Sequence, residues 1–438
     1  MSIIRNSFAS RLSVGRVHSQ PRTNSKVLLL VLAVGSLALL TTSSHAERLV
    51  TPQDMILERQ NVGGKIDLNE RLQDFEPHGT GAESRHEFSF DFHDRFGQNT
   101  RYLRFIFSDL RLADGEVLEL LSPLLDKPVD TIVGPWGGDG GENYYSPIIP
   151  GPRVEVILHG GKPLRASGMI KSVVFQKAPG NVKSIFGPDD RQPVSDFAEN
   201  EDIASLAKSI VFLSILNQFD QPSTCSGFLV NASEILTNKH CFFAPAEECK
   251  KVAILFGFDQ HIADGVAYRC LDITTEHDVA DDSIVLDYAI VRLNRPVTAE
   301  VKPIALHTFD TISLPDIKEG EELPEPMNKL DGLLIHHPAG EPKQVTKTNC
   351  RIYNERVIGA ASAVDFRHRC DTLKGSSGSP VLAIEQAMDN EPIFCTIGLH
   401  HAAFHPHGPF MSYNRAVWMP FIAEKLSENG VAFTPCGN

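Results

Sequence analysis

The distribution of cysteines constrains this chain more than any other feature of its sequence. Residues 47–224 contain no cysteine, whereas residues 225–438 contain all eight. The eight are Cys225, Cys241, Cys249, Cys270, Cys350, Cys370, Cys395 and Cys436. An even number, with no close pair of the C-x-x-C type that thiolate metal sites use, predicts disulfides and an oxidising compartment. The count alone leaves the pairing open.

The N-terminus has the features of a secretory signal. A basic lead precedes an apolar run, VLLLVLAVGSLALL, at 27–40, and Ser44 and Ala46 supply the small residues of a cleavage site. The alternative is a membrane anchor, but a helix of this length spans only about 21 Å of the roughly 30 Å hydrocarbon core. We therefore expect 1–46 to be a signal peptide. The protein is then secreted or periplasmic, with no membrane contact after signal cleavage.

Composition predicts a globular body that does not bind nucleic acid. Hydrophobic residues make up 42% of the chain and charged residues 22%, which is enough apolar material for a buried core. The net charge is −14, and the first 26 residues hold five basic residues and no acid, so the remainder is more acidic still. Such a surface repels phosphate backbones, and we expect no nucleic-acid partner.

Short alternating strands dominate the region that lacks cysteine. Phe88, Phe90 and Phe92 alternate with polar residues, and similar alternation occurs near 103–107 and 154–158. Glycine-rich turns separate these runs. Period-two strands at this spacing predict an antiparallel sandwich with its own core.

The boundaries follow from changes in composition. We predict a β-sandwich-like prodomain over 47–180 and a linker over 181–206, which is rich in proline, glycine and acidic residues. An exposed linker is open to proteolysis, so we expect the chain to be a precursor that is cleaved there. Arg191 and Lys208 are the candidate sites if the protein processes itself.

Three short motifs in the second half indicate chemistry. The first, CSGFLVNASEILTNKHC, ends with His240 beside a cysteine. The second, LDYAIVRL, places Asp287 at the start of an apolar strand. The third, KGSSGSPV, places Ser377 between Gly375 and Gly378. Each motif alone is common, but the combination of all three is far more specific.

The residue types fit nucleophilic catalysis. A serine hydroxyl needs an imidazole to take its proton, and the imidazole needs a carboxylate to fix its tautomer. The tetrahedral intermediate also needs backbone N–H groups aimed at its oxyanion. Gly375 permits a tight turn that can direct its own N–H and that of Ser377 to one point. We therefore predict His240, Asp287 and Ser377 as a triad, with Asp281 and Asp282 as rival carboxylates.

From about residue 205 to the C-terminus the sequence resembles the chymotrypsin-like, or trypsin-like, serine proteases. The CSGFLV…LTNKHC and GSSGSP motifs are similar to the family's catalytic-histidine and nucleophile segments. IHHPAGEPKQ (335–344), GLHH (398–401) and VGPWGGDGGENYYSPIIPG (133–151) look most like the bacterial branch near lysyl endopeptidases. The resemblance implies an all-β protein whose protease domain (207–438) is a double antiparallel β-barrel, preceded by the sandwich and closed by a C-terminal helix over about 420–429.

The resemblance also implies how the cysteines pair. Cys225–Cys241 would join the strands that hold the histidine, as in the family. Cys249–Cys270 and Cys350–Cys370 are then neighbours in sequence, which leaves Cys395–Cys436 to attach the C-terminal tail. One departure is that Ser376 stands where a trypsin zymogen has an Asp that binds the new N-terminal ammonium, so that activation switch is not expected here.

Specificity is predicted from the residue six positions before the nucleophile. In trypsin-like members this position forms the floor of the primary pocket, and Asp371 there implies cleavage after Arg or Lys. The alternatives are that Asp371 only hydrogen-bonds its own loop, or that His400 lines the cleft and selects acidic side chains. Met411 is expected on the opposite wall.

The remaining histidines offer a competing chemistry. His400, His401, His405 and His407 lie within eight residues and could bind zinc as a hydrolase does, but no Asp, Glu or Cys lies among them. We read them as part of the substrate cleft or as structural, and we expect no metal and no cofactor. The expected partners are protein or peptide substrates and the protein's own prodomain. The main alternative function is a catalytically inactive protease fold that binds a partner.

Overall fold

A computed structural model describes ten segments of the chain. They are residues 63–74, 77–78, 83–92, 100–176, 183–275, 286–308, 329–353, 364–386, 392–404 and 413–436. The predicted signal peptide, the rival carboxylates Asp281 and Asp282, and Met411, His405 and His407 lie outside these segments. Within them, no helix is both long enough and apolar enough to cross a bilayer.

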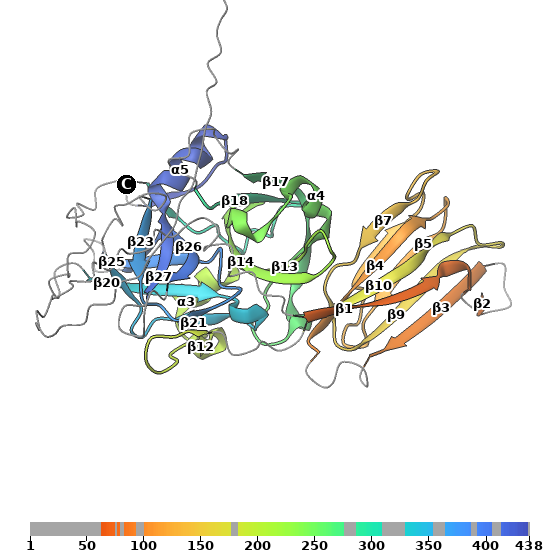
Figure 1. The fold of residues 1–438 in the computed structure, drawn as a ribbon, viewed down its shortest axis with the longest axis horizontal. Helices are drawn as coiled ribbons and strands as arrows, with labels where there is room; N and C mark the ends of the chain where they lie inside the picture. Colours follow the sequence, from red (N-terminus) through yellow and green to blue (C-terminus); the bar gives the residue numbers. More distant parts are fainter. Residues whose placement is uncertain are drawn as a thin grey trace, which may run out of the picture. The chain divides into compact units, whose positions relative to one another are not determined.

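The N-terminal part is a β-sandwich of two five-stranded sheets, as predicted (Figure 1). One sheet has the order β1 (Gly63–Arg71), β10 (Ser167–Gln176), β4 (Tyr102–Arg111) and β7 (Glu142–Tyr145), and β8 (Ile149–Pro150) also pairs with β4. The other has the order β2 (Pro77–His78), β3 (Glu83–Asp91), β9 (Arg153–Gly161), β5 (Val117–Leu121) and β6 (Asp130–Val133). The alternating residues Phe105, Phe107, Val154 and Val156 fill the core between the sheets.

Residues 102–107 of β4 are buried, because this strand contacts the sandwich core on one face and the C-terminal part of the chain on the other. Tyr102 donates a hydrogen bond from its hydroxyl to Ser214 Oγ, at 2.9 Å. The buried guanidinium of Arg104 donates to the carbonyl oxygens of Ser146, Ser214 and Lys251, at 3.0, 2.9 and 2.9 Å. A buried cation is stable only when its donors are satisfied, and carbonyls from two domains do this here.

The first barrel of the protease part is a closed ring of six antiparallel strands. Its order is β13 (Ile210–Leu216), β14 (Pro222–Asn231), β15 (Glu234–Thr237), β18 (Ala289–Leu293), β17 (Val266–Thr275) and β16 (Val252–Phe256). Every residue of β13 is buried, which explains its uninterrupted apolar run.

The second barrel also closes on itself. Its ring runs through β20 (Lys329–His336), β22 (Arg351–Tyr353), β23 (Asp365–His368), β27 (Tyr413–Trp418), β26 (Pro392–Phe404) and β25 (Pro380–Gln386), and β25 pairs back to β20. The double-barrel prediction is therefore confirmed. Short strands β19 (Leu306–His307) and β28 (Pro435–Cys436) extend this sheet.

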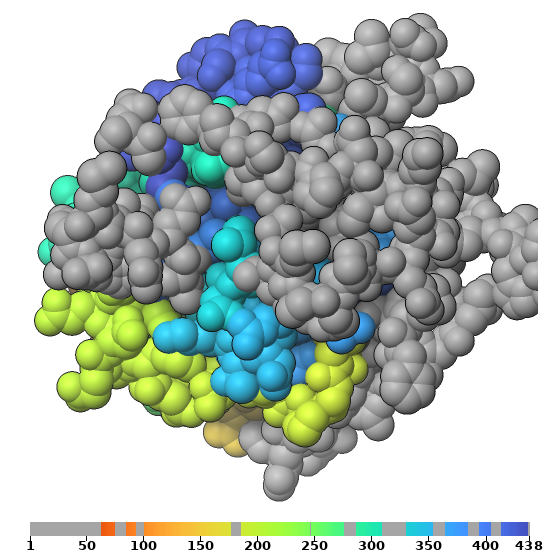
Figure 2. Space-filling model, turned by 90° about the vertical axis from the view of Figure 1, so that its left-hand side faces the viewer, coloured from red at the N-terminus to blue at the C-terminus, as the bar shows by residue number. Residues whose placement is uncertain are grey.

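The C-terminal helix is α5 (Met419–Glu428), one residue earlier than predicted at each end. Proline occupies its first turn, and Gly430 follows it with a φ of +69°, which is the left-handed conformation that ends many helices. In Figure 2, α5 is the dark blue element at the surface of this face.

The predicted linker differs from the structure. Residues 192–208 form β12 (Gln192–Pro193), η3 (Val194–Phe197) and α3 (Glu201–Lys208), and β12 pairs with β21 (Gln344–Thr346) of the second barrel. Figure 2 shows yellow-green residues from this region on the surface beside light blue residues of that barrel. Val194, Ile203 and Ala207 are buried in the protease core. This stretch is therefore part of the protease fold, because its spaced apolar residues have a core to cover.

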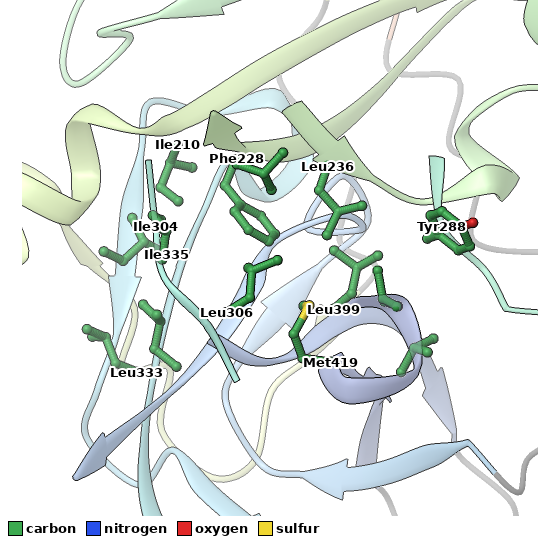
Figure 3. Packing of buried hydrophobic residues seen from close by; sticks show 14 of the residues in the cluster. Ile210, Phe228, Leu236, Tyr288, Ile304, Leu306, Leu333, Ile335, Leu399 and Met419 are labelled. Carbon is green, nitrogen blue, oxygen red and sulfur yellow. The ribbon is translucent and has the colours of Figure 1, made fainter. Parts of the chain in front are cut away.

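The core between the barrels gathers side chains from both. Figure 3 shows Phe228 and Leu236 of the first barrel together with Leu333 and Leu399 of the second and Met419 of α5. Burial of this surface fixes the two barrels against each other. The loops that carry the predicted triad belong to these two barrels.

All eight cysteines form disulfides in the pairing that the resemblance implied. The pairs are Cys225–Cys241, Cys249–Cys270, Cys350–Cys370 and Cys395–Cys436.

Candidate active site

His240 lies in a single turn of 3-10 helix, η4 (Lys239–Cys241), that directly follows β15. The next residue, Cys241, is joined by its disulfide to Cys225 in β14. The imidazole is thus held between a strand end and a covalent link to the neighbouring strand. Asn238, which directly precedes this turn, is fully buried.

Asp287 lies two residues before β18 and faces His240. Its Oδ2 is 2.6 Å from Nδ1 of His240, and its Oδ1 accepts the backbone N–H of His240 at 2.9 Å. Asn238 fixes the backbone at the same point, because its side-chain N–H donates to the Asp287 carbonyl at 2.8 Å. A carboxylate can only accept, so Nδ1 carries a proton and Nε2 is left to accept one.

Two neighbouring imidazoles keep the carboxyl group of Asp287 ionised. Burial alone would raise the pKa of its carboxyl, but the nearby imidazoles of His240 and His401 more than offset burial and keep that pKa well below its usual range. The carboxylate is therefore ionised throughout the neutral range.

Ser377 lies in the loop between β24 (Thr372–Leu373) and β25, and its residue is 4% exposed. Its carbonyl accepts the N–H of Ser226 at 2.8 Å, which ties the loop to β14. No hydrogen bond between Ser377 and His240 is recorded among the described residues. In proteases without substrate this contact is often long and tightens only in the reacting complex.

The loop also presents two unused donors. Gly375 has a φ of +97°, and Ser226 Oγ donates to the Gly375 carbonyl at 2.9 Å, which turns the peptide and fixes it. Within the described segments, the backbone N–H groups of Gly375 and Ser377 have no acceptor. Two free N–H groups beside a serine hydroxyl have the composition of an oxyanion hole.

Ser376 is satisfied without an ammonium partner. Its Oγ is 2.7 Å from Nδ1 of the buried His336 and accepts the N–H of Leu373 at 3.2 Å. Burial keeps the pKa of His336 well below its usual range, so this ring is neutral. Ser376 and His336 thus form a neutral pair, whereas the activation switch of a trypsin zymogen would need a negative Asp and a positive N-terminal ammonium.

Asp371 is 1% exposed, and its carboxylate is already occupied in this chain. Oδ1 accepts the N–H of Phe186 at 2.7 Å, and Oδ2 accepts the N–H of Asp190 at 3.1 Å. Burial and the nearby charge of Asp371 raise the pKa of the Asp190 carboxyl to about 6. The carboxylate of Asp371 is thus held by residues 186–190, which directly precede β12.

His400 is buried and pairs with another histidine. Its Nδ1 is 3.1 Å from Nε2 of His368. Burial first, and then the neighbouring His368, keep the pKa of His400 well below its usual range, so it is a neutral group.

The described residues hold one cluster with the spacing of a metal site, formed by Cys225, His240 and Cys241. Its two sulfurs are joined in a disulfide and offer no thiolate to a metal.

Sequence reasoning missed two residues next to the triad. His401 was seen only as part of the histidine cluster, yet its Nδ1 is 3.3 Å from Oδ2 of Asp287. On its other side, Nε2 of His401 is 3.1 Å from Oδ2 of Asp365, which no motif marked.

The two closed barrels are consistent with a trypsin-like double barrel, and they carry the His–Asp pair and the glycine-flanked serine loop. Residues 204–398 match the Trypsin family model; the match covers less than half of the chain and supports a chymotrypsin-like serine protease family. A comparison with curated proteins found no match to the chain.

Proposed function

We propose that this protein is a secreted serine endopeptidase in which Ser377, His240 and Asp287 form the catalytic triad. The observation that carries the proposal is the contact of 2.6 Å between His240 and Asp287 in a trypsin-like double barrel that also presents a glycine-flanked serine. A catalytically inactive binding protein has no need for a partly buried, ionised carboxylate behind the imidazole.

The steps use only groups of the chain itself. Ser377 Oγ attacks the scissile carbonyl carbon, while Nε2 of His240 takes the hydroxyl proton. The carbonyl oxygen becomes an oxyanion that accepts hydrogen bonds from the N–H groups of Gly375 and Ser377. His240 then gives its proton to the leaving amine, which yields an acyl-enzyme, and water repeats the sequence to release the acid. Asp287 stabilises the imidazolium in both halves.

For specificity we propose cleavage after Arg or Lys, with Asp371 at the floor of the primary pocket. This requires the N–H groups of Phe186 and Asp190 to leave its carboxylate, since a carboxylate already satisfied by two donors attracts a cation less strongly. The competing assignment, acidic specificity through His400 in β26, is favoured by that occupied state of Asp371.

We further propose that the chain is made as a precursor and exported by residues 1–46. Support comes from the basic and apolar leader and from the sandwich that precedes the protease domain. Similarity of the GLHH and IHHPAGEPKQ motifs supports a place in the bacterial branch near lysyl endopeptidases. Cleavage between the sandwich and β12 would release residues 186–190 from their covalent tether.

Digestion of a peptide library by the purified protein tests these proposals. We expect cleavage mainly after Arg and Lys, unaffected by a chelator, and a fall of about 10⁶ in kcat for Ser377→Ala. Cleavage mainly after Glu would replace Asp371 by His400 as the specificity residue. Chelator-sensitive hydrolysis that survives in Ser377→Ala would contradict the serine mechanism.

A further inference from the structure

A second imidazole lies behind the carboxylate of Asp287. The ring of His401 is 3% exposed, and its two nitrogens face two different carboxylates. Nδ1 is 3.3 Å from Asp287 Oδ2, an ion-pair contact without hydrogen-bond alignment. Nε2 is 3.1 Å from Asp365 Oδ2 and is aligned for a hydrogen bond. Two carboxylates can both be served only by a ring that carries a proton on each nitrogen.

A β-bulge in β26 places the ring of His401 between these carboxylates. In the pairing of β26 with β27, His400 is opposite Ala416 and Ala402 is opposite Arg415, so His401 is an extra residue without a partner. Such a bulge turns a side chain away from the face that strict alternation would give it. Both His400 and His401 are consequently buried, although they are consecutive in a strand.

The surroundings distinguish the charges of these two histidines. Burial would lower the pKa of His401, but Asp365 and Asp287 raise it to about 10. His400 is equally buried, and within the described segments its side-chain hydrogen-bond partner is His368, so it stays neutral. The two adjacent histidines therefore differ in charge, His401 positive and His400 neutral, because His401 lies between carboxylates.

Among the described residues, the titratable groups around His401 come from several elements. Asp287 before β18 and Asp365 in β23 contact its ring, and His368 in β23 and His400 in β26 lie near it. Two further groups contact those carboxylates: His240 in η4 is paired with Asp287, and Arg415 in β27 with Asp365 at 3.9 Å. The two carboxylates of Asp287 and Asp365 thus lie beside two cations, His401 and Arg415, which lets the cluster stay charged inside the protein.

We propose that His401 is a permanently protonated positioning residue that holds Asp287 in place behind His240, and that Asp365 is the counter-carboxylate that keeps His401 charged. This rests on the proposed triad. When His240 takes a proton during catalysis, the charges alternate along the array: His240 is positive, Asp287 negative, His401 positive and Asp365 negative. His401 gives Asp287 a third contact, in addition to the side chain and the backbone N–H of His240.

The charge of His401 also affects the proposed catalytic base, His240. A positive His401 weakens the negative potential that the carboxylate of Asp287 exerts on the imidazole of His240. A core histidine with a merely structural role would be neutral and would have no such effect. The acidic limb of the pH profile of kcat/KM reports the pKa of the free base and therefore the charge of His401.

The first test compares His401→Gln with His368→Gln. Glutamine keeps a donor for one carboxylate but removes the positive charge, so the midpoint of the acidic limb should move up by about one pH unit. His368 is buried in the same cluster and neutral, so its replacement should leave the midpoint within about 0.3 unit, whatever its effect on kcat. An unmoved or lowered midpoint in His401→Gln would overturn the proposal.

The second test needs no activity and no folded His401 variant. In full-length Ser377→Ala protein labelled with ¹⁵N-histidine, both ring nitrogens of His401 should show the shifts of an imidazolium from pH 5 to 9. In Ser377→Ala/Asp365→Asn the ring should lose its proton at least one pH unit earlier. A neutral ring at pH 7 in the Ser377→Ala protein would refute the proposal.

The proposed triad and the proposed role of His401 can be refuted independently. If a fluorophosphonate does not label Ser377 in the wild-type protein, the proposed function is wrong, whereas the charge of His401 is still measured by NMR. If Ser377 is labelled and His401 is neutral, the triad stands and only the positioning role of His401 is lost.

Discussion

A series of glycine-to-alanine substitutions connects the geometry of the nucleophile loop to activity. Gly378, directly after Ser377, has a φ of +88°, and an added Cβ would lie 2.1 Å from the Ser226 carbonyl oxygen and 2.3 Å from Thr237 Oγ1. Neither can move far, since both belong to strands of the first barrel. Gly430 after α5 is the matched control, because its φ is +69° and nothing lies within 4 Å of an added Cβ.

The expected costs differ by what surrounds each site. In Gly430→Ala the only cost is the strain of a left-handed alanine, and the lower conformational entropy of the unfolded chain offsets part of it. The net loss of unfolding free energy should be about 1 kcal/mol. Gly378→Ala bears the same strain and a backbone clash, so we expect a loss of about 3 kcal/mol or more. Relief of the clash displaces Ser377, and a shift near 1 Å costs about 10²-fold in rate.

Urea denaturation and kcat/KM measured on the same preparations check this reasoning. Gly430→Ala should keep wild-type kcat/KM, and Gly378→Ala should lose about 10²-fold or more. Gly375→Ala should lie between them in stability, because its added Cβ would meet Ala339 N and Thr224 Oγ1 at 3.0 Å. Wild-type activity in Gly378→Ala would refute the claim that contact with the first barrel holds the nucleophile in place.

Three further predictions follow from charge, crosslinks and the pocket. His401 has a folded pKa of about 10. In the unfolded chain it is near 6.5. The folded state therefore binds more protons between these values, and its stability should fall as pH rises from about 7 to 10, by at most 1.36 kcal/mol per unit. His401→Gln should flatten that decline in urea denaturation, and an unchanged slope would contradict it. Removing the Cys225–Cys241 disulfide with paired alanines should cost about 3 kcal/mol of unfolding free energy and reduce activity, whereas a loss below 1 kcal/mol would mean that it does not brace η4. Asp371→Ser should reduce turnover of basic substrates far more than fluorophosphonate labelling, and an equal loss of both would argue that Asp371 only supports the loop.

Sequence reasoning succeeded where a residue lies in a short, local pattern. His240 and Asp287 each adjoin a recognisable strand, and the two strands, β15 and β18, pair with each other, so the structure places their side chains 2.6 Å apart. The sandwich followed equally well from alternation, because one buried face per strand leaves a period of two.

The remaining features depend on information that a single sequence does not carry. The role of His401 depends on a bulge, which changes register by one residue and cannot be seen in an alternating pattern. Asp365 belongs to no motif and reaches His401 only through strand pairing. The linker prediction was misled by prolines and acids, although Ile203 and Ala207, four residues apart, are the apolar stripe of an N-capped helix.

Labelling with a fluorophosphonate, followed by mass spectrometry of the modified residue, tests the central claim most directly. The account predicts covalent phosphonylation at Ser377, with rates that fall sharply in His240→Ala and less in Asp287→Asn, and no labelling in Ser377→Ala. A folded wild-type protein that is not labelled, or one labelled at another serine, would contradict the assignment of the catalytic triad.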